Sequence, residues 1–110
     1  MTLKTVPMKL LVIVAEAFLR ERLMTELKTL GVSGCTAATV TGWGHDAVRA
    51  SEWENPSVRL ETVVAPELAD AVLELLAQKY FPQGSVVAWL SDVSVVRAEK
   101  FATSTSPATR

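Results

Sequence analysis

The sequence predicts an α+β domain of ferredoxin-like topology, an antiparallel sheet with two helices on one face. Three observations predict it. The apolar segments follow the order strand, helix, strand, strand, helix, strand, which is the split β-α-β arrangement. Each expected helix has a single apolar stripe, as a helix that covers a sheet should. The length of 110 residues and the 49% hydrophobic content fit one small globular domain.

The first half of that order begins with a strand over residues 8–15, a continuous apolar run rich in β-branched side chains. A helix follows, because leucines recur at helical spacing until Gly31, which ends the pattern as a C-terminal glycine does. These leucines are Leu19, Leu23, Leu27 and Leu30. Residues 36–40 are small and β-branched and predict the second strand.

In the second half, residues 58–64 alternate in the manner of a strand. Pro66 suits a first helical turn, and the helix that it begins is expected to end at Phe81-Pro82. One face of this helix is marked by Leu68, Val72, Leu75, Leu76 and Tyr80. The last strand is expected over residues 86–90, with a weaker strand-like piece at Val93, Val95 and Val96.

The strands expected at residues 8–15 and 86–90 are taken as the outer strands of the sheet. A sheet with one face in water reads as alternating apolar and polar residues. Residues 10–15 and 86–90 are instead apolar at odd and even positions alike. We therefore expect the second face to be covered by further copies of the chain, in a closed homo-oligomer.

Residues 45–57 form a polar connection that is long for a compact domain, and such connections are commonly functional or mobile. Trp43 lies just before this connection and Trp53 lies near its end. The two indoles either pack under the connection or at a subunit contact, or they stack on a ligand or partner. Residues 102–110 are expected to be a disordered tail, which leaves residues 1–101 as the domain.

Several functions are excluded by composition. A net charge of −1 offers no field for a nucleic acid, and the apolar run of residues 10–15 is too short for a signal peptide or a membrane span. A single Cys35 cannot form an internal disulfide, so a cytoplasmic protein is expected. His45 reads as an exposed loop residue, and neither a catalytic triad nor metal-ligand spacing is present, so no enzyme is expected.

Gly42-Trp43-Gly44 lies at the expected end of the second strand, where glycines let backbone N–H groups form an anion-binding nest. The same glycines also suit a plain turn or bulge. Arg49, Arg97 and Lys100 are the cations that would serve such a site, unless they are solvated surface residues.

Residues 31–36, Gly-Val-Ser-Gly-Cys-Thr, and the later Gly-Trp-Gly resemble a passage of the PII nitrogen-regulatory signalling proteins. Residues 58–64 resemble that family's third strand, and Val95-Val96-Arg97 resembles its arginine-bearing segment. The resemblance spans residues 8–101. It implies a homotrimer that binds an adenine nucleotide in clefts between subunits and engages a target through residues 45–57, the family's T-loop.

Carried over residue by residue, the resemblance implies that Thr36, Glu61 and Val63 contact the base, that Gly42 and Gly44 follow the ribose and phosphates, and that Arg97 meets the phosphates. Hydroxyl and backbone groups suit a purine edge, and a guanidinium suits phosphate. No metal and no tightly bound cofactor are implied. The full expected nucleotide site is Thr36, Thr41, Gly42, Trp43, Gly44, Arg49, Glu61, Val63, Gly84, Ser85, Arg97 and Lys100.

The sequence departs from the family pattern in four places. Residues 81–85 replace the family's glycine- and lysine-rich phosphate loop, and the T-loop has no tyrosine. His45 stands where an arginine is frequent, and Glu99 replaces a basic residue that binds phosphate. The ligand expected is therefore ADP or AMP, with ATP and cyclic AMP as alternatives.

This shortened pattern, with Arg49 in the T-loop, resembles the PII-like branch found beside bicarbonate transporters and carboxysome genes. It implies bicarbonate as a second ligand and a partner in inorganic-carbon uptake or fixation. Two other readings remain open: a trimeric metal-ion tolerance protein of the same topology, and an assembly module that binds only protein.

Overall fold

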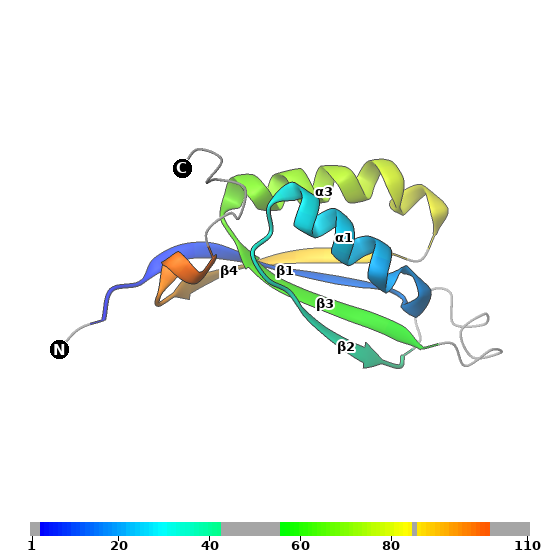
Figure 1. Ribbon diagram of the computed structural model, residues 1–110, viewed down its shortest axis with the longest axis horizontal. Helices are drawn as coiled ribbons and strands as arrows, with labels where there is room; N and C mark the ends of the chain where they lie inside the picture. Colours follow the sequence, from blue (N-terminus) through cyan, green and yellow to red (C-terminus); the bar gives the residue numbers. More distant parts are fainter. Residues whose placement is uncertain (1–2, 43–55, 85, 102–110) are drawn as a thin grey trace.

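The computed structural model describes residues 3–42, 56–84 and 86–101. It has two layers, with a four-stranded antiparallel sheet below and both long helices above it (Figure 1). None of the helices in these ranges has the length and apolar character to cross a membrane. The elements are β1 (Val6–Glu16), η1 (Ala17–Leu19), α1 (Arg20–Leu30), β2 (Thr36–Val40), β3 (Ser57–Val64), α3 (Pro66–Lys79), η2 (Phe81–Gln83), β4 (Val87–Val95) and η3 (Ala98–Phe101).

The strand order is β2-β3-β1-β4, which confirms the ferredoxin-like fold. The expectation that the first strand is an outer strand is wrong, because β1 lies between β3 and β4. Each strand-helix-strand unit has one strand of the other unit between its own two strands. The first strand of each unit therefore lies in the middle of the sheet. The edges are β2 and β4.

β4 is one continuous strand and not a strong run followed by a weaker piece. Asp92 interrupts the apolar pattern, but it pairs in register with Lys9 of β1 and forms an ion pair with its ammonium group. The strand begins at Val87 and not at Val86, whose side chain is buried just before it. A polar residue with a cross-strand partner therefore does not end a strand.

Both helix boundary signals are confirmed. Gly31 has a φ of 105°, and its N–H and that of Val32 bond back to carbonyls of the last turn of α1. A residue with a side chain would be strained there. Pro66 is the first residue of α3, where its missing N–H costs no helical hydrogen bond.

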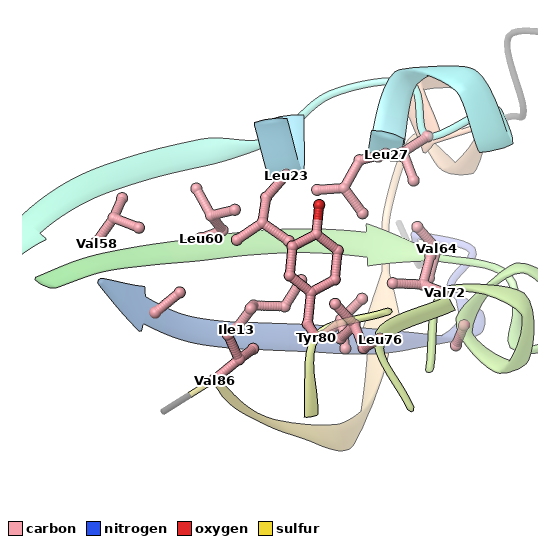
Figure 2. Close-up of a cluster of buried hydrophobic side chains, with 14 residues drawn as sticks. Ile13, Leu23, Leu27, Val58, Leu60, Val64, Val72, Leu76, Tyr80 and Val86 are labelled. Carbon is pink, nitrogen blue, oxygen red and sulfur yellow. The ribbon is translucent and has the colours of Figure 1, made fainter. Parts of the chain in front are cut away.

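The core lies between the helices and the sheet face that they cover (Figure 2). Leu11 and Ile13 of β1 meet Leu23 of α1 and Leu76 of α3, all four without measurable exposure. Leu75, expected on the same helix face as Leu76, is only half-buried and lies outside this cluster. Leu11 and Ile13 are alternate residues of β1, and Leu23 and Leu76 belong to the apolar stripes of their helices, as the sequence pattern predicts.

The opposite face of the sheet is apolar along β1, where it carries Leu10, Val12 and Val14. This confirms that β1 has two apolar faces. Val12 is only 1% exposed although no helix covers it. On this face the guanidinium of Arg59 lies 5.6 Å from the ring centroid of Trp89, at positions that flank β1.

The T-loop predicted at residues 45–57 is shorter at its C-terminal end. Ser57 is the first residue of β3, and the Pro56 carbonyl accepts a hydrogen bond from the Ala17 N–H at 3.2 Å. Alternation between the two sheet faces therefore starts one residue earlier than residue 58. Residues 43–55, with His45 and Trp53 among them, and the tail at 102–110 lie outside the described ranges.

Tyr80 joins the two helices. Its ring packs in the core (Figure 2), and its hydroxyl donates to Oε2 of Glu26 on α1 at 2.5 Å. The Lys79 ammonium lies 3.1 Å from Oε1 of the same carboxylate. The Tyr80 hydrogen bond, helped by Lys79, lowers the pKa of Glu26, and burial with the Glu26 contact raises the pKa of Tyr80 to about 12.

We expect Tyr80→Phe to lower the free energy of unfolding by about 1.5 kcal/mol at pH 7, because a hydrogen bond to a charged acceptor is lost. The pKa of Glu26 is lowered in the folded state, so its contribution is present above the unfolded pKa and is lost as the pH falls through the folded pKa. Urea unfolding at pH 7 and pH 3 measures the difference. Equal destabilisation at both pH values would contradict this account.

Candidate functional site

An open pocket of about 330 Å³ lies where β2 begins, beside the end of β3 and η3. It combines hydroxyl, thiol, carboxylate and ammonium groups with an apolar floor. Its lining residues are Leu10, Ser33, Gly34, Cys35, Thr36, Glu61, Thr62, Val63, Lys100 and Phe101.

Two hydrogen bonds hold the wall of the pocket that leads into β2. The Thr62 hydroxyl donates to the Gly34 carbonyl at 2.6 Å, and Thr62 is only 6% exposed. The Ser33 hydroxyl donates to the Lys100 carbonyl at 3.3 Å, which ties η3 to the same wall. Segments 67 residues apart in the chain therefore form one site.

Thr36 and Glu61 are direct cross-strand partners in β2 and β3, and Val63 follows Glu61 on the same sheet face. The Nε of Arg59 donates to Oε2 of Glu61 at 2.7 Å. A hydroxyl, a carboxylate and strand backbone side by side can hydrogen-bond the edge of a heterocyclic base. Lys100 adds a cation for an anionic group on the same ligand.

Three of the expected site residues lie at the opposite end of the sheet. Thr41 and Gly42 follow the end of β2, and Gly84, with a φ of 120°, precedes β4. In the sheet register Thr36 and Glu61 are level with Val12 and Trp89, and Gly42 follows Thr36 by six residues along β2, at most about 20 Å at the usual rise per residue. Figure 1 shows β4 running from its yellow start beneath α3 towards the orange η3. The pocket residues and this second group are therefore separated along the sheet within one subunit.

Arg97 opens the turn that carries Lys100. It has a φ of 59°, and its carbonyl accepts the Lys100 N–H at 2.9 Å. Its guanidinium is 3.8 Å from the Glu99 carboxylate and largely exposed, and it is not part of the pocket lining. The structure thus brings together Thr36, Glu61, Val63 and Lys100. Trp43, Gly44, Arg49 and Ser85 lie outside the described ranges.

The buried hydroxyl of Thr62 and the side chains of Leu10, Ser33 and Phe101 also belong to this pocket and were not predicted from the sequence. The alternation of β3 could have found Thr62, a polar residue at an inward position between Leu60 and Val64. No local pattern marks Phe101, because its place depends on how η3 turns back.

Cys35 is half-buried and lines the pocket. Burial raises the pKa of its thiol. The thiolate is the reactive form, so we expect iodoacetamide to alkylate Cys35 slowly at pH 7 and faster as the pH rises above 9. It is the only cysteine, so intact-mass spectrometry reads the rate directly. A rate at pH 7 equal to that of a free cysteine peptide would contradict the raised pKa.

Within residues 3–42, 56–84 and 86–101, no three His, Cys, Asp or Glu side chains gather closely enough to hold a metal ion. One open pocket in these ranges combines a hydroxyl, a carboxylate and an ammonium group. Such a pocket, with a few convergent polar groups in an α+β domain, is a candidate ligand-binding site.

The family model described as nitrogen regulatory protein P-II matches residues 8–100. The chain belongs to the P-II family, in its PII-like branch. No match was found among curated protein sequences.

Solved structures agree with this assignment. A PII-like signalling protein from Thermus thermophilus is 42% identical over 90% of this chain and 99% of its own, with a TM-score of 0.77. CPII from Thiomonas intermedia, bound to ADP and bicarbonate, is 28% identical over 92% and 100%, with a TM-score of 0.80. The same protein bound to ADP, AMP and acetate is 29% identical over 89% and 97%, with a TM-score of 0.79.

Proposed function

We propose that this chain is a cytoplasmic, non-enzymatic signalling protein that assembles as a homotrimer and binds ADP or AMP in clefts between subunits. Bicarbonate is a second ligand in this proposal. Ligand occupancy changes the state of the T-loop, which then engages or releases a partner in inorganic-carbon uptake or fixation. Such a ligand can shift the loop only by its difference in affinity for the two loop states.

The observation that carries the proposal is the separation of the expected site into two groups. Thr36, Glu61 and Lys100 lie together in the pocket, whereas Gly42 follows the end of β2 and Gly84 precedes β4. A cleft between neighbouring copies unites them, because one end of a subunit can meet the opposite end of the next. The exposed Val87 and Trp89 on the uncovered sheet face favour such packing.

Within that cleft, the base of the nucleotide is contacted by Thr36, Glu61 and Val63. Gly42 and Gly44 lie along the ribose and phosphates, and the site is completed by Thr41, Trp43, Arg49, Gly84, Ser85, Arg97 and Lys100. The Arg97 guanidinium is largely exposed and has a weak 3.8 Å contact with Glu99 to give up when it turns to a phosphate. The proposed site has few cationic side chains to bind phosphates, which favours ADP or AMP over ATP.

The relatives supply the choice of ligands. CPII from Thiomonas intermedia has been solved with ADP and bicarbonate, and with ADP, AMP and bicarbonate. The family match and the pocket at Thr36, Glu61 and Val63 support the same ligand class here. A bicarbonate transporter or a carboxysome-related protein is the proposed partner, reached through residues 45–56.

A thermal-shift panel tests this function against its two competitors. ADP or AMP should raise the melting temperature, because a ligand that binds only the folded state stabilises it by mass action. A rise with divalent metal and none with nucleotide would favour a metal-ion tolerance protein. No rise with any adenine nucleotide, bicarbonate or metal would favour an assembly module and reject the proposal.

A further inference from the structure

Arg59 and Trp89 contribute to a contact that the proposed function does not use. Arg59 on β3 pairs in register with Val14, and Trp89 on β4 pairs with Val12, so both side chains lie on the sheet face away from the helices. The guanidinium reaches across β1 to within 5.6 Å of the indole centroid. Val12 is only 1% exposed between them, so this contact covers the middle of the open face.

The same guanidinium also contacts the pocket. Its Nε donates to Oε2 of Glu61 at 2.7 Å, with both side chains 40% exposed. A guanidinium is planar, so it can donate along its edge to a carboxylate while its face lies against an aromatic ring. Arg59 therefore connects a group that lines the pocket with an aromatic ring on the outer sheet face.

We propose that Arg59 is a positioning residue that holds the Glu61 carboxylate for the ligand and couples occupancy of the pocket to the Trp89 ring. This inference rests on the proposed function and names a coupling within that site. Arg59 fixes Oε2 and leaves Oε1 of Glu61 to accept from an amino or hydroxyl group of a nucleotide. A donor that engages Oε1 draws the carboxylate towards the ligand, and the guanidinium hydrogen-bonded to Oε2 moves with it relative to the indole.

Fluorine NMR of protein labelled with 5-fluorotryptophan tests the coupling on the full chain. The chain has three tryptophans, and the Trp89 signal is the one that disappears in Trp89→Phe. ADP is titrated into the parent, into Arg59→Gln and into a control, Arg20→Gln, whose arginine lies on α1 on the opposite side of the sheet. Calorimetry on the same samples measures ADP affinity independently of the NMR signal.

In the parent and in Arg20→Gln, we expect ADP to shift the Trp89 fluorine signal. Half of this shift should be reached at the ADP concentration that calorimetry gives for half-saturation. Arg59→Gln should weaken ADP binding by about tenfold, because Glu61 loses the charge-assisted hydrogen bond that holds it for the ligand, and should abolish the Trp89 shift at saturation. Without ligand, Glu61→Gln should itself move the Trp89 signal, because Arg59 loses its charged acceptor.

An unchanged Trp89 response to ADP in Arg59→Gln would overturn the coupling. So would a Trp89 signal that stays in place in ligand-free Glu61→Gln. If the parent shows no ADP binding in the calorimeter, the proposed function fails, and the Glu61→Gln spectrum still decides whether Arg59 links the pocket to Trp89. The two failures are therefore distinguishable.

Discussion

Replacing Leu76 with alanine is expected to lower the free energy of unfolding by about 3 kcal/mol, the largest stability effect that we predict. The side chain has no exposed surface and sits in the core cluster between α3 and the sheet. Truncation removes buried methyl groups and leaves a cavity that a strand and two helices cannot easily close. Urea denaturation followed by circular dichroism measures the change.

The neighbouring leucine is the matched control. Leu75 occupies the next position of α3, is only half-buried and lies outside the core cluster. The same substitution there should cost less than about 1 kcal/mol, since both variants have equal helix propensity and differ only in burial. Equal losses at the two positions would show that the core does not lie where the structure places it.

The second large effect is on ligand binding. Thr36→Trp should weaken ADP binding by at least about 100-fold, because an indole that occupies the pocket adds a steric cost of several kcal/mol to ligand entry. Thr36 is exposed on the edge strand β2 and lines the pocket, so the larger side chain can be accommodated without disturbing the core. Isothermal titration calorimetry gives the affinity.

Two controls separate a filled pocket from a damaged fold. Thr36→Ser keeps a hydroxyl of similar reach and should bind ADP within a few-fold of the parent. Thr39→Trp places the same indole on the same strand at an exposed position that is not part of the pocket lining, and it should bind normally. Normal ADP binding by Thr36→Trp would move the site elsewhere.

Local patterns predicted the elements of this fold well, since apolar period, Gly31 and Pro66 are local signals of strand, helix end and helix start. Strand order was harder. The central place of β1 follows from how the two strand-helix-strand units interleave, and no residue of β1 encodes it. The continuity of β4 through Asp92 depends on a partner, Lys9, that is distant in the chain.

The site was predicted in part. Thr36, Glu61 and Val63 were found through a family resemblance, and their common pocket follows from the register of β2 and β3. Thr62 and Phe101 were missed because their contributions are tertiary: a buried hydroxyl that holds the Gly34 carbonyl, and a turn that folds back onto the sheet edge. Cross-subunit contacts cannot be read from one chain's sequence by periodicity alone.

The most direct test of the central claim is a calorimetric titration of the assembled protein with ADP, repeated in the presence of bicarbonate. We predict saturable binding with one ADP per subunit, because each proposed cleft combines Glu61 of one subunit with Gly42 of its neighbour. AMP should compete for the same sites. The absence of saturable heat with ADP, AMP and cyclic AMP, with and without bicarbonate, would contradict it.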